Sequence, residues 1–350
     1  YATALALAGD DLLVGSPAVE STGVVYHYRR AGDDWTLRGV IRPPEDSGAA
    51  AFGAALSVDG DRLIVGAPAA DADAGRAYVV TRGDSGEWGT ARTLELPSDP
   101  EGAPDANGSA VLLSGEHAWV GAPGAQRVFV LEEGTDGTWS TVQTLTPGDV
   151  RGSAFGFSLA VAGDELLVGA PRQMGSDGRV YRFVRDPSGT FAPRGRIDPD
   201  ETEGASWPLG FGYAVAAAGA RAAVGMPTRD FGEGRALSLD LRDDAWVHAD
   251  LLEGRIHRIG EELTSGDRCT EGRMGEFPCT NMELVGHMSV DDLGGERGVW
   301  VNDVWGWEDP DTGRQYALVA RRDGASFVDV TNPSSPRLVG NLPRTRGSRP

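Results

Sequence analysis

One short phrase recurs five times within residues 1–250 and limits what the chain can fold into. Each copy ends in Val-Gly-x-Pro, and the glycines of these motifs lie 48 to 56 residues apart. A second glycine always lies six residues earlier, at the start of a predicted turn. A period near 50 residues is typical of β-propeller blades or of a solenoid. The Val-Gly-x-Pro glycines, called the anchor glycines below, are Gly15, Gly66, Gly121, Gly169 and Gly225.

The fourth copy shows what each repeat predicts. Strands are expected at Phe157–Ala162, Glu165–Gly169, Arg179–Arg185 and Phe191–Ile197. Gly163-Asp164 joins the first two, with glycine in the first position that a type II′ turn requires. Four short strands per repeat and no helical period favour an all-β fold, a β-propeller of four-stranded blades, over an α-solenoid.

An aromatic residue follows each anchor glycine by about 20 residues. One aromatic per blade at the blade period predicts packing between blades, with a binding stripe as the alternative. Phe155 and the Gly-Ala-Pro corner of the same repeat are expected to pack between blades as well. The aromatic set is Trp35, Trp88, Trp139, Phe191 and Trp246.

Three repeats begin with Phe-Gly, at Gly53, Gly156 and Gly212, and Asn107-Gly108 takes that place in the third copy. Phe-Gly, then Gly-Asp, then Val-Gly-Ala-Pro resembles the FG-GAP repeats of the integrin α-subunit propeller and of bacterial surface proteins. The resemblance covers about residues 1–250.

Many blades of that family carry a calcium loop with several aspartates. Here the thirteen residues between Phe-Gly and the anchor glycine hold a tight turn with one or two carboxylates. Calcium takes six to eight oxygens, so we expect no calcium of the family type in these turns. Asp71 and Asp73, in the loop after Gly-Ala-Pro, are an alternative calcium site, and a solvated turn is the competing interpretation.

Residues 251–283 are predicted to be a connector. It contains the chain's two cysteines, Cys269 and Cys279, which are expected to form a disulfide. A metal site is the alternative, but zinc needs four ligands and no Cys-x-x-Cys or paired histidine is nearby. A disulfide across so short a loop would contribute about 2–3 kcal/mol. It would also indicate a compartment outside the reducing cytoplasm.

Residues 284–350 predict a different blade, with strands at Val299–Trp305, Gln315–Arg321 and Ala325–Val330. "YALV" and "FVDVTNPSSP" resemble LVIVD-repeat propellers. The whole order of motifs resembles the bacterial choice-of-anchor B family, which implies a secreted or cell-surface protein, and the chain is expected to be a fragment or processed form of a longer one.

The segment Asn302–Asp311 is the most distinctive polar and aromatic cluster. Asp303, Trp305 and Trp307 are candidates for a sugar or other ligand site. Asp309 and Asp311 are candidates for a cation site. The alternative is a structural role, in which the tryptophans contribute to packing and the acidic side chains lie on the surface of a hairpin.

The formal net charge of −20 argues against nucleic acid and anionic membranes as partners. The sequence contains no apolar run long enough to span a bilayer and no HExxH, GxSxG or P-loop motif. The chain is therefore expected not to be an enzyme. It is expected to mediate adhesion, binding or surface assembly through a protein or glycan ligand or by self-assembly. No cofactor is expected, with Ca²⁺ as the alternative. The alternatives are a structural subunit of a surface filament or layer, and a propeller hydrolase or lyase with a channel active site.

Overall fold

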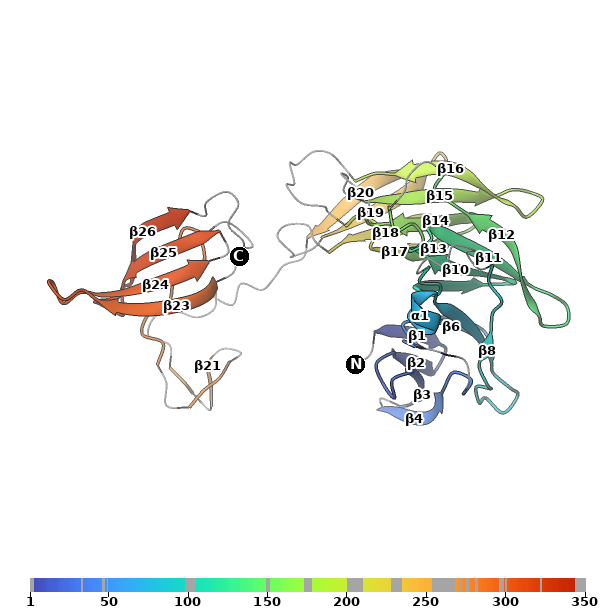
Figure 1. Ribbon diagram of the computed structural model, residues 1–350, viewed down its shortest axis with the longest axis horizontal. Coiled ribbons are helices and arrows are strands. Elements are labelled where there is room, and N and C mark those ends of the chain that lie inside the picture. Colours follow the sequence, from blue (N-terminus) through green and yellow to red (C-terminus); the bar gives the residue numbers. More distant parts are fainter. Residues whose placement is uncertain are drawn as a thin grey trace. The chain divides into compact units, whose positions relative to one another are not determined.

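The computed structural model is built from β-sheets and divides into two units (Figure 1). Unit 1 comprises residues 1–229 and 235–253, and unit 2 comprises residues 230–234 and 254–350. Much of the expected connector, and residues 1 and 2, lie outside the described residues. The structure describes residues 3–32, 34–45, 48, 50–97, 105–148, 152–172, 178–199, 210–227, 235–253, 268–270, 272–274, 277–280, 283–295, 299, 301–321 and 323–343.

Unit 1 contains five antiparallel four-stranded sheets, called blades 1 to 5, which follow one another in chain order (Figure 1). In every blade, neighbouring strands in the sheet are also consecutive in the chain. Blade 1 consists of β1 (Ala4–Ala8), β2 (Asp11–Ser16), β3 (Val24–Ala31) and β4 (Asp34–Ile41). Blade 2 consists of β5 (Ala55–Asp59), β6 (Arg62–Ala67), β7 (Arg76–Thr81) and β8 (Arg92–Thr93). Blade 3 consists of β9 (Ala110–Ser114), β10 (His117–Ala122), β11 (Arg127–Glu133) and β12 (Trp139–Leu145). Blades 4 and 5 consist of β13 (Ser158–Ala162), β14 (Glu165–Ala170), β15 (Arg179–Arg185) and β16 (Phe191–Ile197); and β17 (Ala214–Ala218), β18 (Arg221–Met226), β19 (Arg235–Arg242) and β20 (Ala245–Glu253). This arrangement confirms the predicted β-propeller fold.

The first two strands of every blade are joined by the predicted two-residue turn. In blade 4, Ala162 pairs with Glu165 around Gly163-Asp164. The glycine of this turn has φ between 58° and 62° in all five blades, a conformation that glycine adopts without steric cost. The repeated Gly-Asp dipeptide is therefore a turn signal.

The face of a blade on the side of the preceding blade is called its leading face, and the opposite face is called its trailing face. At each junction between consecutive blades, the trailing face of one packs on the leading face of the next. Between blades 1 and 2, Leu13 and Val25 of the trailing face contact Leu63, Val65 and Tyr78 of the leading face. Three further apolar clusters join blades 2 and 3, 3 and 4, and 4 and 5. The core of unit 1 is thus distributed over the junctions between blades.

The Phe-Gly loops also seal these junctions. Phe155 is fully buried, and its ring contacts that of Tyr181 edge to face with centroids 5.3 Å apart. The carbonyl oxygen of Gly156 lies against Gly121 of the preceding blade, where a Cβ would be 2.0 Å from it. The same contact recurs at Gly15, Gly66 and Gly169. The prediction that Phe155 and the Gly-Ala-Pro corner pack between blades is confirmed.

The turns between the third and fourth strands of blades 3 and 4 are held by an aspartate. Asp136 Oδ1 accepts hydrogen bonds from the hydroxyl and backbone N–H of Thr138, at 2.6 and 3.0 Å. Asp186 Oδ1 accepts the same two bonds from Ser188, at 2.6 and 2.8 Å. The hydroxyl bonds are the main reason that the pKa of each aspartate lies below its ordinary value.

These two turns are expected to respond to acid. Because folding lowers both pKa values, their stabilisation is complete above the ordinary aspartate range and is lost as the pH falls through the lowered values. We expect the backbone amide signals of Thr138 and Ser188 to shift in an NMR titration only at a pH below the ordinary aspartate pKa. Asp136→Ala should remove the transition at Thr138 and leave that at Ser188. A transition at the ordinary aspartate pKa would contradict the assignment.

Unit 2 contains one antiparallel sheet, in the order β23-β24-β25-β26, and the short pair β21 (Arg273–Met274) and β22 (Phe277–Pro278). Its core comprises Leu293, Val319 and Val328 on one side of the sheet. The first predicted strand runs further than expected, to Glu308, and a fourth strand was missed. The strands of the sheet are β23 (Val301–Glu308), β24 (Gln315–Arg321), β25 (Gly324–Asp329) and β26 (Arg337–Pro343).

A short helix, α1 (Ala70–Asp73), lies in unit 1.

Candidate functional site

A polar residue opens the second strand of every blade, immediately after the two-residue turn. It lies four residues before the anchor glycine, on the trailing face of its blade. We call this set the junction belt. Its members are Asp11, Arg62, His117, Glu165 and Arg221.

At the junction of blades 1 and 2, Asp11 is the centre of a buried ionic cluster. Asp11 Oδ1 lies 2.8 Å from Nε2 of His27, and its other oxygen accepts a hydrogen bond from Arg82 of blade 2. Arg82 also lies over the ring of Trp88, 5.5 Å from its centroid. Because buried charges are costly unless they are paired, this cluster holds the two blades in register. His27 is 3% exposed and is closed to a substrate.

At two other junctions, a charged residue of the belt also helps to join neighbouring blades, with different partners. Arg62 of blade 2 donates to Glu133 of blade 3 at 2.6 Å. Glu165 of blade 4 accepts hydrogen bonds from Arg182 of its own blade, and Arg182 donates in turn to the carbonyl oxygen of Asp244 in blade 5 at 2.8 Å. These belt residues are occupied in joining blades.

His117 differs from the other members of the belt. Its Nε2 lies 3.0 Å from Oε1 of Glu132, the residue directly opposite it on β11. The imidazole stacks on Trp119 with centroids 5.8 Å apart, and Phe191 of blade 4 contacts its edge. The side chains of His117 and Glu132 are 11% and 43% exposed, so the pair reaches solvent. A histidine oriented by a carboxylate is an arrangement that serves as a general base.

Neither histidine–carboxylate pair was predicted from the sequence. Histidine and carboxylate are 15 or 16 residues apart in the chain and meet only through strand pairing. The register of the β10–β11 pair places His117 opposite Glu132, and Leu13, adjacent to Asp11 on the same face, opposite His27. A strand register assigned from the repeat could have found them.

The residues predicted as a calcium site in unit 1 both lie in α1. The carboxylate of Asp71 accepts a hydrogen bond from Arg76, and both Asp71 and Asp73 have positive φ. Among the described residues, no group of three or more histidine, cysteine, aspartate or glutamate side chains could hold a metal ion.

The residues predicted as sites in unit 2 lie on and after β23. Asp303, Trp305 and Trp307 alternate along the strand and share a face of the sheet. Trp305 is 71% exposed, and Trp307 stacks on Tyr316 at 5.6 Å.

Asp309, by contrast, holds the β23–β24 turn. It accepts hydrogen bonds from the backbone N–H of Asp311 at 3.0 Å and from the hydroxyl of Thr312 at 2.5 Å. Hydrogen bonds from the Thr312 hydroxyl and the Asp311 N–H lower the pKa of Asp309.

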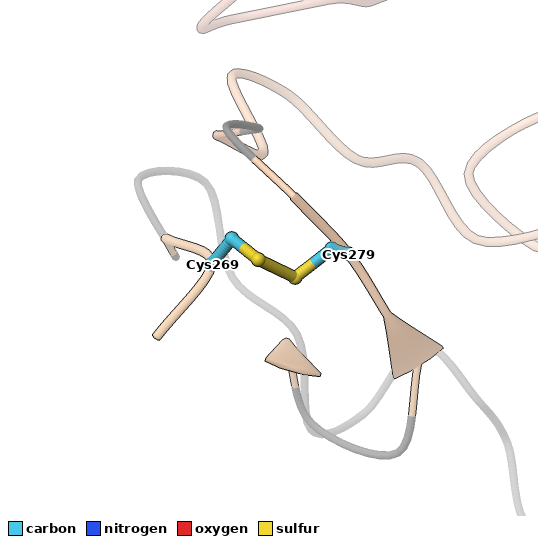
Figure 2. The surroundings of a disulfide bond; sticks show 2 residues. All are labelled: Cys269 and Cys279. Carbon is cyan, nitrogen blue, oxygen red and sulfur yellow. A yellow bond between two sulfur atoms is a disulfide. The ribbon is translucent and has the colours of Figure 1, made fainter. Parts of the chain in front are cut away.

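Cys269 and Cys279 form a disulfide, as predicted (Figure 2). Their Cα atoms are 5.8 Å apart. The described residues include no helix that is both long and apolar enough to cross a membrane. The disulfide favours an extracellular or periplasmic protein over a cytoplasmic one.

The sequence profile of the FG-GAP repeat matches residues 35–80 and 139–183. The chain thus contains FG-GAP repeats within a β-propeller fold. The matched segments run from the fourth strand of one blade into the third strand of the next, so they span the sealed junctions 1–2 and 3–4. Comparison with curated protein sequences finds no match. The LVIVD and choice-of-anchor B resemblances stay predictions.

Solved structures of similar fold include the periplasmic gluconolactonase PpgL of Pseudomonas aeruginosa, at 14% identity and a TM-score of 0.52, covering 97% of this chain and 85% of that one. A Bacteroides uniformis protein, proposed to be a 6-phosphogluconolactonase, is 15% identical with a TM-score of 0.50, covering 96% and 83%. A Lactobacillus plantarum protein is 14% identical with a TM-score of 0.51, covering 97% and 84%. At this identity the likeness shows the fold.

These comparisons correct the expected function. The expectation of a non-catalytic adhesion, binding or assembly protein, and of a chain that is not an enzyme, is contradicted, because similar propellers are named as lactonases. They favour the enzyme alternative. The sequence did not indicate an enzyme because the propeller repeat carries no catalytic motif of its own and fold does not determine function.

Proposed function

We propose that the FG-GAP propeller is a hydrolase that opens small carbohydrate lactones, with His117 as general base and Glu132 as the residue that orients it. The observation that carries the proposal is the solvent-reaching His117–Glu132 pair at 3.0 Å. The lactonase names of propellers with similar folds supply the reaction class.

The proposed chemistry follows from the hydrogen bond that the imidazole makes. When Nε2–H donates to Glu132, Nδ1 is the nitrogen that can accept a proton from water. The hydroxide equivalent attacks the lactone carbonyl, and the ring C–O bond then breaks. The imidazolium returns its proton to the leaving ring oxygen, which yields the open hydroxy acid. Glu132 stabilises the imidazolium between these two steps.

The charge of the chain selects among lactones. A net charge of −20 repels anionic substrates at long range. We therefore propose that the substrate is a neutral sugar lactone such as gluconolactone, with the phosphorylated lactone a poorer substrate. A glycan was one of the ligands expected from the sequence, and we now propose a carbohydrate as the substrate.

The experiment is hydrolysis of gluconolactone and 6-phosphogluconolactone by the purified chain, followed by acid release at constant pH. We expect turnover above the spontaneous rate, faster for the neutral lactone. Hydrolysis at the spontaneous rate for both lactones would overturn the proposal. A preference for the phosphorylated lactone would overturn its substrate assignment. We also propose that the reaction needs no resident cofactor, and loss of activity with a calcium chelator would point instead to Asp71 and Asp73 or to Asp309 and Asp311.

We propose further that the protein is secreted by a bacterium and acts at the cell surface. The FG-GAP repeats, the disulfide and the family that the C-terminal motifs resemble support this location. Surface biotinylation of intact cells tests it, and recovery of the protein only from the cytoplasm would contradict it.

A further inference from the structure

The leading face of blade 1 has no preceding blade on it within the described residues. In blade 2, the leading-face residues Leu63, Val65, Tyr78 and Val80 are fully buried against blade 1. The residues at the matching positions of blade 1 are only half-buried, and they are Leu12, Val14, Tyr26 and Tyr28. On the same face of blade 1, Leu5 and Leu7 of β1 are 65% and 64% exposed, and Trp35 of β4 is 42% exposed. The apolar residues of this face are Leu5, Leu7, Leu12, Val14, Tyr26, Tyr28, Trp35, Leu37 and Val40.

Strand pairing shows that these side chains form one surface. Leu5 pairs with Val14 and Leu7 with Leu12 across β1 and β2. Val14 pairs in turn with Tyr26, and Leu12 with Tyr28, across β2 and β3. Residues directly opposite in antiparallel strands lie on the same face. The face is therefore continuous over all four strands of the blade.

The four junctions inside unit 1 indicate what covers such a face. In each, the leading face receives the trailing face of another blade, whose innermost strand presents mostly small residues. Blade 1 presents Ala4, Ala6 and Ala8 there, and blade 4 presents Ser158, Ala160 and Ala162. Small side chains on the trailing strand leave room for the leucines and valines of the leading strand.

The charge on this face selects among possible blades. Arg82 and Trp88 of blade 2 reach Asp11 and His27 of blade 1. Arg30 and Trp35, which pair across β3 and β4, occupy the matching positions in blade 1. Arg30 Nε donates only to the nearby carbonyl of Gly32 in the described contacts. The arriving blade should therefore carry a carboxylate at its junction-belt position, as blade 1 itself does with Asp11.

This requirement excludes blade 5 of a second copy as the natural occupant. Its belt residue is Arg221, which would face Arg30 with the same charge. We propose that the leading face of blade 1 is a docking surface for one further FG-GAP blade, whose innermost strand carries small residues and whose second strand begins with an aspartate or glutamate.

A duplicated blade tests the proposal in the full chain. Residues 1–51 are repeated ahead of Tyr1, which puts Tyr1 where Phe52 stands in the repeat, and Asp11 of the added copy then meets Arg30 of the original. Among the described residues all cysteine is in the disulfide, so Leu7→Cys in the original blade supplies one thiol at an exposed site of the leading face. Its reaction with a thiol reagent measures whether the face is covered.

We expect the thiol to react at least about tenfold more slowly in the duplicated chain than in the parent chain, because it reacts only when the new junction opens. Asp11→Arg in the added copy should restore the fast reaction. Adding Arg30→Glu to that variant should slow it again, since the charges are then exchanged. A reaction as fast as in the parent would overturn the proposal, whether the added blade folds apart or does not fold. Equal slowing with and without the Asp11→Arg substitution in the copy would overturn the charge requirement.

Discussion

A chain with alanine in place of Gly121 is expected to lose about 3 kcal/mol of its free energy of unfolding, the upper part of the range for overpacked cores. The added Cβ would lie 2.0 Å from the carbonyl oxygen of Gly156, which belongs to the backbone of the next blade. That loop cannot retreat freely, because Gly156 N–H donates to the carbonyl of Gly169 at 3.1 Å. Urea unfolding followed by tryptophan fluorescence measures the loss.

The matched control is Gly225→Ala, at the anchor glycine of blade 5. Among the described residues, the nearest atom to a Cβ there is the Cβ of Ala214, at 3.4 Å, an ordinary contact. The free energy of unfolding should change by less than about 0.5 kcal/mol. Equal losses in the two variants would show that the anchor glycines are required for strand conformation and not for the approach of the next loop.

His117→Gln is expected to lower kcat for gluconolactone by about 100-fold or more, the effect of removing a general base. Glutamine keeps a polar group beside Glu132 but cannot accept a proton from water at neutral pH. Glu132→Gln should lower kcat by a smaller factor, because the imidazole remains while its orienting charge is lost. Steady-state rates over a range of lactone concentrations separate kcat from KM.

Glu133→Gln is the control for this pair. Glu133 is the next residue along β11, but its carboxylate accepts a hydrogen bond from Arg62 and not from His117. The variant should keep its kcat and lose some stability at the junction of blades 2 and 3. A kcat that falls equally in Glu132→Gln and Glu133→Gln would assign both residues a structural role.

Most of the propeller could be predicted from the sequence because turn chemistry repeats with the blades. The strands Arg179–Arg185 and Phe191–Ile197 have the predicted bounds, and β14 ends one residue later than expected. The strand expected from Phe157 begins at Ser158, because the N–H of Phe157 belongs to the Phe-Gly loop and donates to Ala154 and Gly169. Glycine and proline mark turns by their own backbone properties, so these bounds need no tertiary information.

The features that the sequence analysis missed depend on contacts between distant residues. The strand Arg337–Pro343 contains glycine and proline and has no buried face, so it lacks the alternation that marks a strand. The His117–Glu132 pair depends on the register of β10 with β11. Its chemistry also depends on the aromatic wall formed by Trp119 and Phe191, and Phe191 belongs to the next repeat.

The partners of the junction belt give the repeats a fixed order. Asp11 accepts a hydrogen bond from Arg82 of the second repeat, whereas Arg62 of the second donates to Glu133 of the third. A chain permuted so that the third repeat followed the first would set Asp11 against Glu133, two carboxylates in a buried place. The sign of the charge that each repeat presents at a junction thus determines which repeat can pack next to it. Repeats with nearly the same backbone are not interchangeable, and misordered stacking during folding is penalised at the first wrong junction.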